Sequence, residues 1–283
     1  MAILSKLIIY PIKSCAGIPV PEATLTRAGL ALDGVRDREW MVVDGDGIFL
    51  SQRAHPRMAL ITPRLREGAL ELGAPGMPAL AIALAAHATG GAPPREVRVW
   101  DDVVLADNCG DAAAAWFSQM LGVACRLVRF NAAAARLASA KWTGGVDAPT
   151  RFADGYPVLV AGTASLADVN QKLAAAGRAA LPMDRFRPNL VVDGIGAFEE
   201  DYVDTFGLGA ALLKPVKPCG RCPMPSIDQA TGERGPDPLD IMQAYRRKAQ
   251  VGDEICFGMN AIVVEGEGER LFVGQAVSVA LAF

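Results

Sequence analysis

Short apolar runs separated by turn signals dominate the first hundred residues and most constrain the fold. Asp44-Gly45 and Asp46-Gly47 lie between the runs at residues 39–43 and 48–50. Asp-Gly between two apolar runs is a strong hairpin signal, because both residues tolerate the turn's backbone. Similar runs occur at residues 22–26, 59–62, 71–72 and 80–84. The pattern predicts mainly antiparallel β structure up to about residue 106, as a small barrel or rolled sheet.

The rest of the chain adds helices to further strands. Residues 3–14 predict a strand that ends near Pro11, and residues 85–95 have the Ala, Gly and Pro content of a linker. Apolar residues at helical spacing predict helices at residues 111–121 and from Ser165, as the cap, to 176. A short helix is expected at residues 238–246, and strands at 124–130, 157–161, 190–192, 208–216, 258–264 and 271–281. The prediction is a mainly β fold with some α structure (α+β).

Composition excludes several classes of protein. The net charge of -3 and the scattered basic residues do not favour nucleic-acid binding. No apolar run is long enough to cross a bilayer, and the first residues do not form a signal peptide, so we expect a cytoplasmic protein. Six cysteines spread over the chain suit a reducing compartment. With two histidines, a His-rich zinc site is not expected.

The segment from Lys217 to Met224 carries two cysteines, Cys219 and Cys222, three residues apart. The flanking prolines and the intervening glycine predict a loop. Positive charge on Lys217 and Arg221 is expected to favour thiolates, which are soft metal ligands and good nucleophiles. Four interpretations stay open at this stage: a metal ligand, a redox pair, a sulfur carrier, or two structural cysteines.

Three other segments have the chemistry of anion-binding sites. Lys13-Ser14 follows the first strand, and an ammonium beside a hydroxyl suits an anion. Arg36 and Arg38 are two apart in a predicted strand, so they are expected on one face, where either guanidinium can hold a phosphate or carboxylate. Arg185-Phe-Arg187-Pro-Asn189 precedes a buried strand. The alternative for each is a solvated loop or strand edge.

Together, these motifs resemble the MOSC superfamily. The closer likeness is to the two-domain type represented by the mitochondrial amidoxime-reducing component and by bacterial relatives that act against N-hydroxylated bases. The motifs match in order over nearly the whole chain: Tyr10 to Cys15 with Gly17, Arg36-Asp37-Arg38 with Trp40, Asp107 to Gly110, Phe186 to Asn189, and Cys219 to Cys222 followed by Asp228 and Thr231-Gly232. The resemblance implies an N-terminal β-barrel-like domain over residues 1–122 and a β-rich MOSC domain over residues 123–283.

The resemblance also implies the molybdenum cofactor, Mo-molybdopterin. Cys222 corresponds to the single cysteine that ligates molybdenum in the family, and Cys219 would be its neighbour. The residues at positions that bind the pterin and its phosphate are Lys13, Ser14, Arg38, Arg187 and Asn189. Tyr156 stands where the mammalian relatives carry a serine hydroxyl, and the resemblance makes it a further candidate for cofactor binding. Two departures are expected: no C-x₄-C-x₂-C spacing marks the ferredoxin domain of the best-known bacterial relative, and we expect no membrane-targeting N-terminus like that of the mitochondrial relatives.

The function implied is the two-electron reduction of small N-hydroxylated compounds: hydroxylamines, amidoximes or N-hydroxylated bases. Electrons would come from a separate flavin or iron–sulfur reductase, with no membrane or nucleic-acid partner. Asp228 is a possible proton donor near Cys222. The alternative is a carrier of the molybdenum cofactor, or of sulfur as a persulfide on Cys222. A thioredoxin-like pair of Cys219 and Cys222 ranks third, because the surrounding βαβ pattern is missing.

Overall fold

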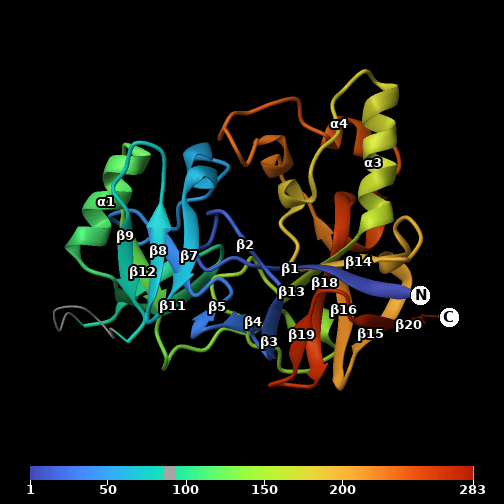
Figure 1. The fold of residues 1–283 in the computed structure, drawn as a ribbon, viewed down its shortest axis with the longest axis horizontal. Helices are drawn as coiled ribbons and strands as arrows, with labels where there is room; N and C mark the ends of the chain where they lie inside the picture. Colours follow the sequence, from blue (N-terminus) through green and yellow to red (C-terminus); the bar gives the residue numbers. More distant parts are fainter. Residues whose placement is uncertain (86–92, 283) are drawn as a thin grey trace.

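The computed structural model describes residues 1–85 and 93–282, and most of its regular structure is strand (Figure 1). The strands of the first half are β1 (Ala2–Ile9), β2 (Ile18–Val20), β3 (Glu22–Thr26), β4 (Gly29–Leu32), β5 (Val35–Arg36), β6 (Trp40–Val43), β7 (Thr62–Arg66), β8 (Ala69–Gly73), β9 (Leu80–Ala83), β10 (Arg95–Val99), β11 (Asp102–Asn108) and β12 (Arg126–Phe130). Those of the second half are β13 (Val158–Gly162), β14 (Leu190–Asp193), β15 (Val203–Leu208), β16 (Ala211–Gly220), β17 (Arg247–Lys248), β18 (Glu254–Glu265), β19 (Arg270–Phe272) and β20 (Ala276–Leu281).

A ring of strands forms the centre of the second half. The order is β13-β14-β1-β20-β15-β16-β18, and β18 pairs back with β13, which closes the barrel. The first strand of the chain therefore lies between β14 and β20, in antiparallel pairing with both. Alternating residues of these strands, such as Leu4, Val160 and Leu213, fill the barrel core. Inserting β1 ties the beginning of the chain to residues more than 180 positions away.

Of the other strands of the first half, β2 pairs with β1 beside the barrel. The rest belong to three small sheets, of which Figure 1 shows β7, β8, β9, β11 and β12 at the left and β3 and β4 at the lower centre. The three sheets have the orders β10-β11-β12-β6, β19-β3-β4-β5 and β7-β8-β9, so β19 of the second half completes one of them. Helix α1 (Asp111–Leu121) packs Phe117 and Met120 onto a core that includes Trp40. Thus β1 of the first half is part of the barrel, and β19 of the second half is part of a first-half sheet. The division at residues 122 and 123 stays a prediction.

Helices cover one side of the barrel. α3 (Thr163–Ala175) and α4 (Leu239–Met242) lie above it in Figure 1, and a short α2 (Ala140–Thr143) precedes β13. Leu173 of α3 and Met242 of α4 share a buried cluster with Phe257 of β18. Short 3₁₀ segments occur at Pro56–Leu60, Met183–Phe186, Glu199–Tyr202, Met224–Ser226 and Ala249–Val251. Within the described residues, no helix has the length and apolar character needed to cross a bilayer.

The mainly β prediction with some helix is confirmed, and several local predictions are wrong. Residues 59–62 were predicted as one strand, but Pro56 starts a 3₁₀ turn and the strand begins at Thr62. Ser165 is not a cap, because Gly162 precedes the helix and the Ser165 hydroxyl is buried, donating to Glu200 at 2.7 Å. Residues 48–50 make single bridges instead of a strand. Of the predicted linker, residues 86–92 lie outside the described residues.

Candidate functional site

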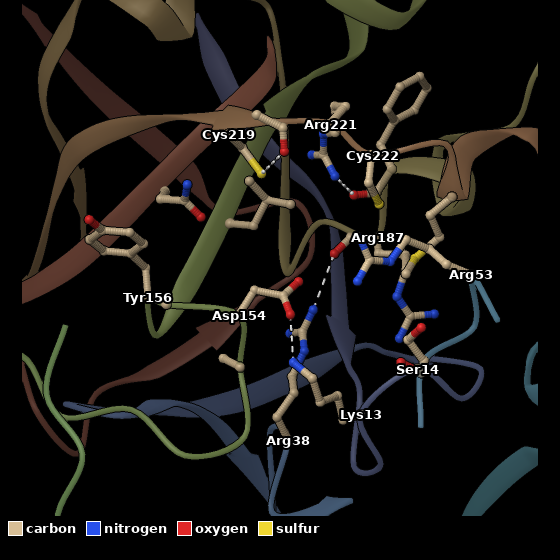
Figure 2. A pocket seen from close by; sticks show the side chains of 18 of the residues that line it. Lys13, Ser14, Arg38, Arg53, Asp154, Tyr156, Arg187, Cys219, Arg221 and Cys222 are labelled. Carbon is tan, nitrogen blue, oxygen red and sulfur yellow. Dashed lines mark hydrogen bonds and ion pairs between the residues drawn. The ribbon is translucent and has the colours of Figure 1, made fainter. Parts of the chain in front are cut away.

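One cavity, of about 900 Å³ including its open mouth, collects most of the predicted site residues. Its walls come from both halves of the chain, and Figure 2 shows their side chains converging on it. The predicted residues that line it are Lys13, Ser14, Arg38, Tyr156, Arg187, Asn189 and Cys222. Asp228 does not line the cavity.

Three of these residues adopt a left-handed backbone that is unusual without glycine. The φ angles are 68° for Ser14, 47° for Arg38 and 55° for Arg187. Such a conformation costs roughly 1–3 kcal/mol per residue, and it gathers at binding and catalytic sites. Each residue comes from a different segment of the chain. The strained backbone at these three positions therefore costs stability, and it orients all three side chains at one cavity.

Arg38 points into the cavity because Asp37 and Asn189 hold its guanidinium. Nη1 donates to Asp37 Oδ2 at 2.5 Å and to Asn189 Oδ1 at 3.0 Å, and Nη2 donates to the Arg187 carbonyl at 3.4 Å. The prediction that Arg36 and Arg38 share one strand face is wrong. β5 ends at Arg36, and the left-handed turn at Arg38 sends its side chain inward, while Arg36 stays exposed beside Glu39. Burial disfavours the charge on Arg38, but Asp37 outweighs it and raises the pKa.

The ring of Tyr10 is a platform for two guanidinium groups. Arg38 and Arg187 lie over it, with their central carbons 4.3 Å and 4.4 Å from the ring centroid. Burial raises the pKa of Tyr10 to about 12, even though both arginines act to lower it. The phenol therefore stays neutral, and its face attracts both cations.

The guanidinium of Arg187 is buried without an ion pair in the described part of the chain. Across residues 1–85 and 93–282, its side chain makes no hydrogen bond or salt bridge to protein, although the residue is only 8% exposed. Burial lowers the pKa of Arg187, and the nearby charge of Arg38 lowers it further. A buried cation without a partner is costly, so this arrangement favours an anion in the cavity.

Lys13 and Asp154 form an ion pair across the cavity wall. Lys13 Nζ donates to Asp154 Oδ1 at 2.5 Å and to the Phe152 carbonyl at 2.8 Å. Burial lowers the pKa of Lys13 despite the carboxylate beside it. The Asp154 side chain is 75% exposed, and the ammonium of Lys13 beside it holds the pKa of the carboxyl well below its usual range. Arg136 donates to three carbonyls of residues 151–154 and so fixes the loop that carries Asp154.

The two thiols reach the cavity from a strand end, and the prediction that both lie in a loop is wrong in part. β16 continues to Gly220 and includes Cys219, because register shifts beside Pro215 and Pro218 accommodate the missing N–H donors. Cys222 lies outside the strand, two residues beyond its end. In Figure 2 both sulfur atoms are on the upper wall of the cavity.

The two basic side chains next to the thiols in sequence, Lys217 and Arg221, interact with other groups of the protein. Arg221 donates to the Phe257 carbonyl, at 2.7 and 3.0 Å, and to that of Phe186 at 2.8 Å. Lys217 Nζ lies over the Trp142 ring. The expected thiolate is therefore wrong for Cys219, because burial raises its pKa more than Arg221 lowers it. All six cysteines are free thiols.

Asn189 and Tyr156 both line the cavity, but they differ in their hydrogen bonds and in the direction of their polar groups. The Asn189 amide already makes four hydrogen bonds, donating to Ile8 and Asp37 and accepting from Leu159 and Arg38. That uses its full capacity, so its amide positions Arg38. Figure 2 shows the Tyr156 ring across the cavity from Cys222, with its hydroxyl directed away.

The structure argues against the predicted role of Asp228 as a proton donor. Its Oδ1 accepts from the backbone N–H groups of Ala230 and Thr231, and Oδ2 accepts from Arg185 at 2.7 Å. The two backbone bonds, with help from Arg185, lower the pKa of Asp228. A carboxyl group with a lowered pKa, outside the cavity, is a poor acid at neutral pH. Its contacts instead hold Arg185, which lines the cavity.

Several residues that build the site were not predicted: Tyr10, Asp37, Arg53, Trp100 and Asp154. Asp37 lies between Arg36 and Arg38, and a carboxylate in such a run is a natural counterion, so this signal was available. Tyr10 stands in the matching motif but has no pattern of its own that predicts a cation platform. Asp154 is 141 positions from Lys13, a pairing that local sequence does not reveal.

Comparison with known proteins gives the chain's relatives. Residues 1–124 match the family described as the MOSC N-terminal beta barrel domain, and residues 147–278 match the MOSC domain. Human mitochondrial amidoxime reducing component 2 is 36% identical over 248 residues, covering 86% of this chain and 72% of the relative. Human mitochondrial amidoxime-reducing component 1 is 32% identical over 249 residues, with the same coverage. Human molybdenum cofactor sulfurase is 31% identical over 246 residues, covering 82% of this chain but 27% of that protein.

Proposed function

The chain belongs to the two-domain MOSC family, and from this premise we propose that it is a molybdenum-cofactor-dependent reductase of N-hydroxylated compounds. The substrates would be hydroxylamines, amidoximes or N-hydroxylated bases, and a separate flavin or iron–sulfur reductase would supply electrons. The observation that supports the proposal most is the buried Arg187 guanidinium, which has no acceptor within the described residues and faces a cavity that also contains the Cys222 thiol.

The residues present fit a cofactor that brings both a metal and a phosphate. Arg187 has unused donors, and so does the Ser14 hydroxyl, which has no protein partner among the described residues. Cys222 supplies one soft ligand. The described residues hold no group of three His, Cys, Asp or Glu side chains that would bind a metal alone. A metal bound here would thus take most of its ligands from the cofactor itself.

Each residue has a separate role in this proposal. Cys222 ligates the molybdenum, Arg187 and Ser14 bind the phosphate, and Arg38, held by Asp37 and Asn189, adds a second guanidinium. When bound, the cofactor supplies the two-electron redox chemistry. The net reaction is R–NHOH + 2e⁻ + 2H⁺ → R–NH₂ + H₂O.

The reaction consumes two protons, and Lys13 is better suited than the carboxylates to supply one. Burial lowers the pKa of its ammonium, whereas the pKa of Asp154 is held too low for an acid at neutral pH. Lys13 Nζ sits in the cavity wall, 2.5 Å from Asp154 Oδ1. The carboxylate orients the ammonium while the cavity lowers its affinity for the proton.

The direct test is the reduction of benzamidoxime to benzamidine by cofactor-loaded protein, with a reduced viologen dye as electron donor. Turnover proportional to molybdenum content is expected. Protein that carries one molybdenum per chain and still gives no benzamidine would overturn the proposal.

The second candidate is a carrier of the molybdenum cofactor or of sulfur. It is favoured by the similarity to molybdenum cofactor sulfurase and by a second thiol, Cys219, in the same cavity. Mass spectrometry and metal analysis of the purified protein separate the two functions. Retained molybdenum supports the reductase, whereas metal-free protein with a persulfide on Cys222 supports the carrier.

A further inference from the structure

The cavity contains more cations than the proposed cofactor accounts for. Of its basic side chains, Lys13 pairs with Asp154, Arg38 with Asp37 and Arg185 with Asp228. Arg221 is satisfied by backbone carbonyls. Among the described parts of the chain, this leaves the cavity with two arginines that have no acidic partner: Arg187, which is buried, and Arg53, which is half-buried.

Arg53 belongs to a rim that we define as Phe49, Ser51, Arg53 and Trp100, all from the first half of the chain. Its guanidinium lies over the Trp100 ring, 4.8 Å from the centroid, and no acceptor for its N–H groups exists within residues 1–85 and 93–282. An arginine stacked on an aromatic face keeps its N–H edge available, and that planar edge matches a carboxylate or phosphate.

The rim is fixed in place before any ligand arrives. Trp100 has a left-handed backbone (φ 56°), and its Nε1 donates to Asp154 Oδ1 at 3.0 Å. The Phe49 ring packs against it with a centroid distance of 4.9 Å. On the other side of Arg53, the buried Gln52 donates to Gln229 at 2.9 Å, and the Arg53 carbonyl accepts from Arg234. The Trp100 ring under the Arg53 guanidinium is therefore held in place, and so is the chain at residues 52–53, which bonds to the second half of the chain.

Depth separates the two unpaired arginines. Arg187 is 8% exposed, whereas Arg53 is half-buried and the Trp100 ring on which it stacks belongs to a residue that is 40% exposed. A cofactor held by Arg187 and Cys222 would occupy the buried part of the cavity, which leaves Arg53, in the same cavity wall, available to a substrate. We propose that Arg53, positioned by Trp100, binds an anionic group on the substrate, so that the site selects N-hydroxylated compounds that carry a carboxylate or phosphate. This inference rests on the proposed function and specifies its substrate class.

The test compares benzamidoxime with 4-carboxybenzamidoxime, which differ by one negative charge. In molybdenum-loaded enzyme, Arg53→Gln should lower kcat/KM for the carboxylated compound about 10- to 100-fold more than for the neutral parent, mainly through KM, as expected for one lost charge-assisted pair. Arg57→Gln, on the exposed 3₁₀ turn outside the cavity, is the matched control and should leave the ratio as in wild type. An equal loss for both substrates in Arg53→Gln would overturn the inference.

A binding measurement keeps this test independent of turnover. Without an electron donor, 4-carboxybenzamidoxime should quench the fluorescence of Trp100, and the quenching should disappear in Trp100→Phe. The ratio of Kd values for the neutral and carboxylated compounds should fall about tenfold or more in Arg53→Gln. An unchanged ratio refutes the role of Arg53, even if the protein reduces neither compound. Loss of molybdenum from Arg53→Gln would instead assign Arg53 to the cofactor phosphate and also overturn the inference.

Discussion

Replacing Asn189 by aspartate should reveal how strongly the cavity depends on one amide. The residue is 1% exposed, and its Nδ2 donates to the Ile8 carbonyl at 3.1 Å and to Asp37 Oδ1 at 2.9 Å. Asn189→Asp keeps the shape but replaces both donors with an acceptor. The new charge would face Asp37 and Arg38 at similar distances, and at an effective dielectric of about 20 these two contributions, each about 6 kcal/mol, nearly cancel.

The remaining cost can be worked out from protonation. A buried carboxyl group whose pKa is raised takes up a proton in the folded state, which costs at most about 4 kcal/mol at pH 7 and about 1.5 kcal/mol at pH 5, starting from a pKa of about 3.9. The protonated group restores one donor, so one buried acceptor stays unpaired, at about 1–3 kcal/mol. We expect Asn189→Asp to lose about 3–6 kcal/mol at pH 7, and to recover up to about 3 kcal/mol of this at pH 5.

Urea unfolding of wild type and variant at both pH values measures this difference. The matched control is Asn170→Asp, because the Asn170 amide also pairs with backbone, donating to Leu181 at 2.9 Å, but lies in a half-buried position on α3. Loss of that single neutral bond should cost about 1 kcal/mol, with little change between pH 5 and pH 7. If Asn189→Asp matched this control at both pH values, the assignment of Asn189 as the brace of Arg38 would be refuted.

Three further predictions use other features of the fold. Burial raises the pKa of Glu200, so the wild-type protein should lose stability as the pH rises from about 4.5 through the folded-state pKa. The Glu200→Gln variant has no such group and should not show this loss. Its free energy of unfolding, relative to that of wild type, should therefore rise between pH 5 and pH 8. Gly258→Ala should lower the free energy of unfolding by about 3 kcal/mol or more, because a Cβ would lie 2.7 Å from the Val160 carbonyl. Gly252→Ala has a similar positive φ but open space around it, so it should lower this free energy by about 1 kcal/mol. Urea unfolding of both variants measures the difference. In a thermal-shift assay, inorganic phosphate should raise the unfolding temperature of cofactor-free protein. The Arg187→Gln variant should lose most of that rise, whereas the Arg126→Gln variant, changed at an exposed side chain, should keep it.

The sequence was a good guide where local chemistry determines the structure. The helix predicted at residues 111–121 has those bounds, and β14 begins at Leu190 as expected. Lys13-Ser14 and Arg187-Pro-Asn189 each follow or precede a strand, and strand ends bring such segments together. Their predicted anion-binding chemistry therefore required little knowledge of the tertiary fold.

Long-range pairing and backbone strain could not be predicted in the same way. Whether β1 belongs to the first or the second half depends on its partners β14 and β20, which both lie in the second half of the chain. The left-handed φ of Arg38 reverses the direction of its side chain, and no residue type at that position signals it. Lys217 and Arg221 are close to the thiols in sequence, yet their charges are directed at an aromatic ring and at carbonyls. Proximity in sequence was a poor guide to the electrostatics of Cys219.

Molybdenum stoichiometry of matched cysteine variants tests the central claim most directly. Cys219→Ser and Cys222→Ser place the same change at two sulfurs in one cavity wall. After loading under identical conditions and gel filtration, Cys219→Ser should retain close to one molybdenum per chain, and Cys222→Ser should retain almost none. Equal retention by the two variants, or selective loss from Cys219→Ser, would contradict the assignment of Cys222 as the metal ligand.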